Sequence, residues 1–143
     1  MLDLNVLGVS ICTREALRLM FKDGVDDGHI ININSVVGHF INDIADTHFY
    51  SATKHMITAL TKALNAELRQ KKTKIRVTSI SPGITETPLM SRLGEGNDKF
   101  KIGDWSGFLK GKDIADAVLY VVGAPPHVNI RELTIAEIGF AGC

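Results

Sequence analysis

The sequence predicts an α/β fold in which helices cover a parallel sheet. Two β-branched runs, at residues 30–35 and 75–80, are each short enough to be one buried strand. They alternate with longer helical patterns, an order typical of parallel strands joined by right-handed crossovers. The chain of 143 residues has the length of one domain with a single core. We therefore expect residues 1–143 to form one domain of about three strands with covering helices.

The first two predicted helices follow from the spacing of apolar residues. Residues 5–22 are apolar at helical spacing, and Asp23-Gly24 is expected to end this helix. Residues 50–69 form a longer helix with apolar side chains on two faces, one made of Ile57, Leu60, Leu64 and Leu68 and the other of Met56, Ala59 and Ala63. A helix that is apolar on two faces is expected to be covered on both.

The second half of the chain is predicted to contain two strands and one helix around a long irregular segment. The strand at residues 75–80 is closed by Ser81-Pro82-Gly83, and the helical pattern is then absent from residue 84 to residue 111. Residues 112–122 are predicted to be helical, and Gly123 with the Pro-Pro pair after it ends that helix. Residues 129–138 alternate loosely as a last strand.

The composition excludes several classes of function. Sixteen basic residues balance sixteen acidic ones, so no net charge attracts nucleic acid or an anionic membrane. The basic run Lys71, Lys72, Lys74 and Arg76 is interpreted as charge that complements the dipole at a helix end. No apolar run approaches the roughly 18 residues that a membrane span needs, and two cysteines are too few for a disulfide framework. We therefore expect a cytoplasmic protein with no membrane span and no metal site.

Tyr50 and Lys54 are the first residues that indicate chemistry. They lie four residues apart at the start of a predicted helix, so they share one of its faces. A nearby ammonium group favours the phenolate and lowers the pKa of a tyrosine, which is ordinarily about 10. The phenol can then act as a general acid or base toward a carbonyl or an alcohol. The same spacing also fits a packed tyrosine beside a solvated lysine.

Ser35 and Asn5 add polar groups close to this pair in the predicted fold. Ser35 ends the first strand, where its hydroxyl either faces Tyr50 or caps the loop. Asn5 starts the first helix, where it either tethers a water or a backbone group or is an ordinary polar residue of a helix N-terminus. Both Ser35 and the Pro82-Gly83 turn follow predicted strands. Because ligands of open parallel sheets bind beyond the carboxyl ends of the strands, we expect the active site there.

Together these motifs resemble the short-chain dehydrogenase/reductase family. The matching stretches, which follow the order of the family, are Asn5-Val6-Leu7-Gly8, Ile31-Asn32-Ile33-Asn34-Ser35-Val36-Val37-Gly38, Tyr50-Ser51-Ala52-Thr53-Lys54, Ser81-Pro82-Gly83 and Thr85-Glu86-Thr87-Pro88. The resemblance covers essentially the whole chain. Residues 10–16, 25–31 and 47–50 look most like the group that contains dehydrogenase/reductase member 11 and the insect farnesol dehydrogenases.

The resemblance implies the C-terminal part of a Rossmann-type doubly wound parallel sheet and an oxidoreductase that interconverts a carbonyl and an alcohol. Tyr50 would be the general acid or base, and Lys54 would lower the pKa of Tyr50 and bind the nicotinamide ribose. Ser35 would polarise the substrate oxygen, and Asn5 would support a proton relay through water. The side of the cofactor that carries the nicotinamide and the pyrophosphate would be lined by Pro82, Gly83, Thr85, Glu86 and Thr87. The cofactor would be NADP or NAD, with NADP favoured.

The resemblance also implies a substrate class and a partner. Residues 89–109 include Met90, Phe100, Trp105 and Phe108, which would cover a small lipophilic substrate such as a steroid, a retinoid or an isoprenoid. These side chains would otherwise fasten a long loop to the domain, although long loops in compact domains tend to be functional. The helices at residues 5–22 and 50–69 would form the interface of a homo-oligomer.

One part of the family pattern is absent from this sequence. The glycine-rich turn that holds the pyrophosphate of a dinucleotide is not found in it. We therefore expect the N-terminal cofactor-binding half to be missing and one edge of the sheet to be exposed. Three interpretations stay open: an incomplete record of an active oxidoreductase, a truncated chain that acts by subunit association, and a remnant that binds a lipophilic ligand.

Overall fold

The computed structural model describes residues 1–41, 47–89 and 107–140. A short π-helix, η1, leads directly into the first α-helix. The elements in chain order are η1 (Asp3–Gly8), α1 (Val9–Lys22), β1 (His29–Ile33), the 3₁₀-helix η2 (Val36–Gly38), α2 (His48–Gln70), β2 (Arg76–Pro82), β3 (Thr85–Glu86), β4 (Leu109–Lys110), α4 (Gly111–Val122) and β5 (Glu132–Ile135).

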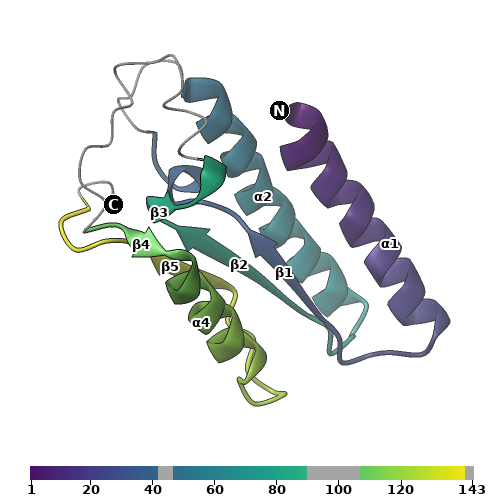
Figure 1. Ribbon diagram of the computed structural model, residues 1–143. Coiled ribbons are helices and arrows are strands. Elements are labelled where there is room, and N and C mark those ends of the chain that lie inside the picture. The colour runs from purple at the N-terminus through teal and green to yellow at the C-terminus, as the bar shows by residue number, and fades with distance from the viewer. Residues whose placement is uncertain (42–46, 90–106, 141–143) are drawn as a thin grey trace.

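Three parallel strands form the main sheet, in the order β1, β2, β5. Ile30 pairs with Val77 across the first two strands, and Ile80 pairs with Leu133 across the second and third. Figure 1 shows α1 and α2 side by side on one face of this sheet and α4 on the other. The predicted α/β class, with parallel strands and covering helices, is therefore confirmed.

The core lies between the sheet and the two long helices. Ile30, Leu68, Ile75 and Val77 are buried together, and Leu17, Met20 and Leu64 pack against them. Full burial of each such side chain stabilises the fold by roughly 1.5–3 kcal/mol. This core fixes α2 over β1 and β2, and it thereby sets where the first turn of α2 lies relative to the strand ends.

The structure corrects several predicted elements. The first helix is divided into η1 and α1, and the last strand is four residues long rather than the whole of 129–138. The segment expected to be irregular contains two short strands, β3 and β4, which pair in parallel through Thr85 with Leu109 and Glu86 with Lys110. Two-residue strands are too short to give a periodic pattern, so the sequence did not reveal them.

The predicted coverage of both apolar faces of α2 is also wrong for this chain. Ile57 and Leu68 are buried, but Met56 is 44% exposed and Leu60 is 40% exposed. Only the face toward the sheet is covered, and α1 lies beside the helix rather than over its outer side. At the edge of the sheet, Ile33 of β1 is 52% exposed, in line with the expected open edge. Among the described residues, no helix combines the length and the apolar character that a membrane span requires.

Candidate active site

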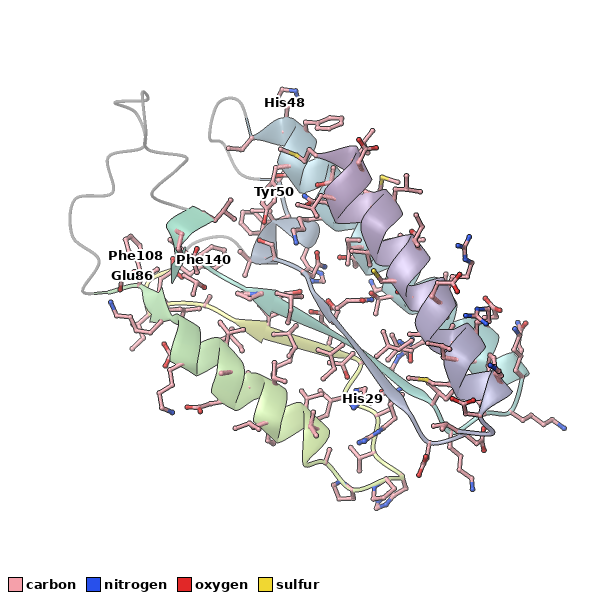
Figure 2. The ribbon with its side chains drawn as sticks, turned by 45° about the vertical axis from the view of Figure 1, so that its right-hand side comes forward. His29, His48, Tyr50, Glu86, Phe108 and Phe140 are labelled. Atoms are coloured by element: carbon pink, nitrogen blue, oxygen red, sulfur yellow. The ribbon has the colours of Figure 1, made fainter. Side chains whose placement is uncertain are left out.

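Ser35 and Tyr50 meet beyond the carboxyl end of β1. Ser35 follows the strand in extended conformation and starts η2, where its Oγ accepts a hydrogen bond from the Val37 amide at 3.4 Å. The same side chain hydrogen-bonds the phenol of Tyr50, which lies in the first turn of α2. Figure 2 shows Tyr50 at this end of the molecule and His29 at the opposite end of the strands. The Ser35 hydroxyl therefore makes both of the contacts that the sequence left as alternatives: it caps the loop, and it faces Tyr50.

Lys54 lies one helical turn after Tyr50 and contacts the end of β1. Its Nζ donates to the carbonyl oxygens of Ile33 and Asn34, at 3.2 Å each. The same nitrogen lies 5.7 Å from the centroid of the Tyr50 ring. Burial lowers the pKa of Lys54. The ammonium group is thus held over the tyrosine by the backbone of β1.

The acidity of Tyr50 differs from the expectation drawn from its spacing to Lys54. Burial raises the pKa of Tyr50 above its ordinary value, and the hydrogen bond with Ser35 partly offsets that increase. The sequence predicts that Lys54 lowers this pKa, but its ammonium group donates to the carbonyl oxygens of Ile33, which ends β1, and of Asn34, which follows it. Desolvation of the phenol is therefore stronger than the effects that favour the phenolate.

Asn5 reaches this group through one intermediate residue. Its Nδ2 donates to Thr53 Oγ1 at 3.1 Å, and that hydroxyl donates to the backbone oxygen of Tyr50 at 2.7 Å. Asn5 lies in the π-helix η1, a form that interrupts α-helices frequently at functional sites. The π-helical turn carries Asn5 against the start of α2, although the side chain contacts neither the phenol nor Lys54 among the contacts described.

The predicted cofactor-side residues lie at the end of the neighbouring strand. Pro82 ends β2, and the Gly83 amide donates to Ile135 O at 2.7 Å. A side chain at Gly83 would lie 3.1 Å from the backbone of Ala136 and 2.5 Å from Glu137 Oε2, so only glycine fits without a shift. Thr85 Oγ1 donates to Gly83 O at 3.1 Å, which closes the turn. Glu86 forms an ion pair with Lys110, and Thr87 follows it in a bend.

A set of buried polar contacts that the sequence did not predict joins β1 and η2 to α2. Thr58 Oγ1 donates to Gly38 O at 2.9 Å and accepts from Asn34 Nδ2 at 2.8 Å. One turn further along α2, Thr61 Oγ1 accepts from Asn32 Nδ2 at 2.9 Å. A single threonine in a helix gives no signal from which such a contact could be predicted. Here Thr58 and Thr61 lie on the same face of α2, and they contact Asn34 and Asn32. These contacts fix the distance between the Ser35 loop and the helix that carries Tyr50 and Lys54.

A second polar cluster links η2 to the other two strands. Ser81 Oγ donates to Glu132 Oε1 at 2.6 Å, and His39 Nε2 lies 3.0 Å from Ser81 Oγ and 3.4 Å from Glu132 Oε1. Ser81 is fully buried, so the cluster joins elements rather than presenting a nucleophile. Nearby in sequence, Phe40 packs edge-to-face on Phe140 with ring centroids 5.4 Å apart.

The structure thus brings Ser35, Tyr50 and Lys54 into one group, with Asn5 behind it and residues 82–87 at the adjacent strand end. Met90, Phe100 and Trp105, expected to cover a substrate, lie outside the described residues. Phe108 is partly buried at the start of the segment that leads into β4. Among the described residues, no group of three or more His, Cys, Asp and Glu side chains could hold a metal ion.

Comparison with known proteins identifies the family. A family model described as short chain dehydrogenase matches residues 1–98. The chain belongs to the short-chain dehydrogenase/reductase family. This short-chain dehydrogenase/reductase chain is 49% identical over 135 residues to dehydrogenase/reductase SDR family member 11 of Gallus gallus, covering 93% of this chain and 53% of the relative. It is also 43% identical to farnesol dehydrogenase of Aedes aegypti, covering 96% of this chain and 53% of the relative.

Solved structures of the family agree with the fold. The closed form of serine dehydrogenase complexed with NADP⁺ superposes with a TM-score of 0.79 and 32% sequence identity, covering 94% of this chain and 53% of that chain. The family is NAD(P)-dependent, and the expected resemblance to the member 11 and farnesol dehydrogenase group is confirmed. This short-chain dehydrogenase/reductase chain spans about half the length of the curated relatives it matches.

Proposed function

We propose that residues 1–143 form a partial domain that supplies the acid–base half of an NAD(P)-dependent oxidoreductase site. The reaction interconverts a carbonyl and an alcohol on a small lipophilic substrate. The observation that carries the proposal is the group at the carboxyl end of β1, where Tyr50 hydrogen-bonds Ser35 and Lys54 lies 5.7 Å from the tyrosine ring. A phenol, a hydroxyl and an ammonium group at one strand end suit proton transfer to a substrate oxygen.

Each residue has a role that its contacts support. Tyr50 donates a proton to the substrate oxygen in reduction and accepts one in oxidation, and its raised pKa keeps it protonated as a donor at neutral pH. Ser35 hydrogen-bonds the same oxygen and polarises the carbonyl. Asn5 acts on the start of α2 through Thr53, and it supports a water that carries the proton onward.

The residues present fit the nicotinamide end of a dinucleotide. Two of the three N–H groups of the Lys54 ammonium are used by Ile33 O and Asn34 O, which leaves one for a ribose hydroxyl. Beside Gly83, Glu137 Oε2 is buried without a partner among the described residues, an acceptor available to a ligand. Pro82, Gly83, Thr85, Glu86 and Thr87 would line that side. The cofactor, when bound, supplies or accepts the hydride.

The substrate class and the cofactor preference belong to this proposal. The 43% identity to an insect farnesol dehydrogenase supports an isoprenoid or a similarly lipophilic alcohol, with steroids and retinoids as further candidates. We favour NADP over NAD from the resemblance to the member 11 group, and similar structures are complexed with NADP⁺ in one case and with NADH in another. We place the protein in the cytoplasm, which fractionation of cells that express a tagged chain would test.

The decisive experiment joins this chain to a cofactor-binding half. A chimera would carry the part of the Gallus gallus relative that this chain does not match, followed by residues 1–143. We expect NADPH-dependent reduction of a lipophilic aldehyde or ketone, and loss of turnover in the Tyr50→Phe chimera with cofactor binding retained. Near-normal turnover of Tyr50→Phe would contradict the role of Tyr50. A folded chimera that binds NADPH but reduces none of the carbonyls in a broad panel would contradict the catalytic proposal.

A second candidate function, association with another copy, is favoured by the outer face of α1 and α2. Leu7, Ile11, Met56 and Leu60 are 40–54% exposed, although they are large and apolar. We propose that these helices pair with a second subunit to form a homo-oligomer. Sedimentation of the chain and of a Met56→Lys/Leu60→Lys variant would test this, because a dimer that depends on this face should dissociate in the variant.

A further inference from the structure

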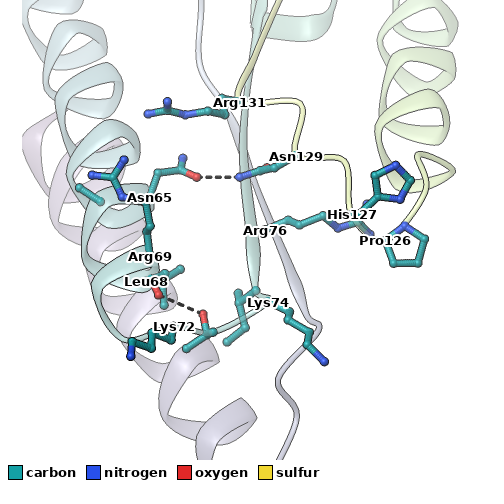
Figure 3. A pocket seen from close by; sticks show the side chains of 13 residues that line it. Asn65, Leu68, Arg69, Lys72, Lys74, Arg76, Pro126, His127, Asn129 and Arg131 are labelled. Atoms are coloured by element: carbon teal, nitrogen blue, oxygen red, sulfur yellow. Dashed lines mark hydrogen bonds between the residues drawn. The ribbon is translucent and has the colours of Figure 1, made fainter.

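A cationic cleft lies at the end of the sheet opposite to the candidate active site. It has a volume of about 430 Å³ and is lined by the C-terminal turns of α2, the connection to β2 and the segment before β5. Arg76 is the first residue of β2 and Pro82 is the last, so the cleft and the active site are separated by about 20 Å. Figure 3 shows the cleft. Arg69 lies on α2, Lys72 lies in the connection that follows this helix, and the side chain of Arg131 points toward α2. The cleft is therefore not part of the acid–base site.

Five lysine and arginine side chains from two distant stretches of sequence line this cleft. They are Arg69, Lys72, Lys74, Arg76 and Arg131, with His127 as a sixth basic side chain and no carboxylate in the lining. Within the described residues, none of the five forms an ion pair. At the edge of the cleft, the Asp26 carboxylate accepts from the Lys74 backbone amide at 3.3 Å, and Glu67 is paired with Lys71, which is not in the lining. The cleft is thus a local excess of positive charge on a chain of zero net charge.

The helix dipole does not account for this charge. The C-terminus of a helix carries the equivalent of about half a negative charge, far less than five cations. The last carbonyls of α2 are also capped already, since those of Glu67, Leu68 and Arg69 accept from the amides of residues 71–73. The interpretation of the basic run as a complement to the dipole therefore explains at most one of these residues.

Specific contacts hold the two walls of the cleft together. Asn129 Nδ2 donates to Asn65 Oδ1 at 2.9 Å (Figure 3). Asn65 Nδ2 in turn donates to Val77 O at 3.0 Å. On the other side of β2, Arg76 Nη1 donates to Ala124 O at 3.1 Å, which fixes its guanidinium group. Lys72 has a φ of 58°, a left-handed conformation that is uncommon for a residue with a side chain.

We propose that this cleft binds a small molecule that carries phosphate groups. Arginine guanidinium groups match the geometry of phosphate oxygens, and lysines add point charges that phosphates favour. The volume is within the range of small-ligand sites. The cations lie around one cleft of about 430 Å³, a size that favours a compact ligand over a nucleic acid strand. Burial, and then the charge of Arg76, lowers the pKa of the neighbouring His29, in agreement with a positive potential at this end.

The test is a calorimetric titration of the chain with inorganic tripolyphosphate. We expect saturable binding of one ligand per chain that weakens as salt is added. The Arg69→Gln/Arg131→Gln variant should bind about tenfold more weakly or worse, because two charged hydrogen-bond donors are lost. The control variant Lys22→Gln/Lys62→Gln removes two positive charges from exposed positions outside the cleft and should bind like the unmodified chain.

A further variant separates binding from folding. Lys72→Gly removes one cation and places glycine where φ is positive, so it should be at least as stable as the unmodified chain and bind about twofold to fivefold more weakly. Absence of saturable binding, or equal weakening in the cleft and control variants, would overturn the proposal. Tighter binding of a single-stranded oligonucleotide than of tripolyphosphate would also overturn it, in favour of nucleic acid. None of these readouts depends on carbonyl reduction.

Discussion

Asn34 and Thr58 are joined by a buried hydrogen bond, in which Nδ2 of the amide donates to Oγ1 of the hydroxyl at 2.8 Å. Thr58 is on α2, one turn after Lys54, and Asn34 precedes Ser35. The hydroxyl of Thr58 in turn donates to Gly38 O at 2.9 Å. One side chain therefore holds both ends of the Ser35 loop against the helix that carries the candidate acid and its lysine.

Replacement of Thr58 by valine should destabilise the chain. The two residues have similar shapes, but valine leaves Asn34 Nδ2 and Gly38 O buried without this partner. An unsatisfied buried polar group costs roughly 1–3 kcal/mol. Urea unfolding should show a decrease in the free energy of unfolding of that order. Thr134→Val on the exposed side of β5 is the matched control, and it should change stability by less than about 0.5 kcal/mol.

Gly38→Ala should displace η2 from α2. A Cβ at this position would lie 2.8 Å from Asn34 Nδ2 and 2.9 Å from both Lys54 O and Thr58 Oγ1. Overpacking of this kind costs roughly 1–3 kcal/mol. Thermal unfolding should show a clear loss, whereas Gly111→Ala, which meets nothing within 4 Å, should be neutral or slightly stabilising. Equal stability of the two variants would show that η2 has room to move.

The order of the elements and the position of the site could be predicted because each depends on local pattern. The strand at residues 30–35 is a β-branched run, the helix at residues 50–69 has a clear period, and a parallel sheet brings its carboxyl ends together. Ser35 and Tyr50 could therefore be placed near each other from sequence. The three-residue η2 and the two-residue strands β3 and β4 are too short for any period to show.

Features that combine distant residues could not be predicted. The cleft needs Arg131 beside Arg69, and the cluster of His39, Ser81 and Glu132 combines three elements. Neither residue type nor sequence spacing predicts that side chains so far apart in the sequence lie together in the fold. The predicted direction of the Tyr50 pKa shift was wrong for a related reason. The spacing placed an ammonium group nearby. It could not show that the carbonyls of Ile33 and Asn34 hold that group, or that the phenol is desolvated.

Lys54→Met tests the proposed ribose contact in the chimera. Methionine has a similar length but cannot donate to Ile33 O, Asn34 O or a ribose hydroxyl. We expect weaker NADPH binding and a slower rate of reduction. The variant loses a charged hydrogen bond to the ribose, which contributes roughly 1.5–3 kcal/mol to binding. Lys62→Met on the exposed side of α2 is the control and should change neither. An unchanged NADPH dissociation constant in Lys54→Met would remove Lys54 from cofactor binding.

Titration of Tyr50 can be observed directly because the chain has two tyrosines. Tyr120 is 65% exposed, so a Tyr120→Phe variant leaves the phenolate absorbance of Tyr50 alone. We expect this signal to titrate above the ordinary value of about 10. Tyr50→Phe in the same background removes this signal and is the control. A Tyr50 midpoint at or below about 10 would mean that burial is not the dominant effect.

The contribution of Ser35 has the opposite sign. Its hydrogen bond lowers the pKa of Tyr50, so Ser35→Ala in the Tyr120→Phe background should shift the titration further upward. Since the folded pKa of Tyr50 is raised, the stability linked to its protonation is fully present below about pH 10 and is lost as the pH rises through the raised value. Tyr50→Phe should therefore lose less stability than the unmodified chain in that alkaline range. Chemical denaturation at several pH values would measure the difference, and parallel curves would show that Tyr50 ionises without cost to the fold.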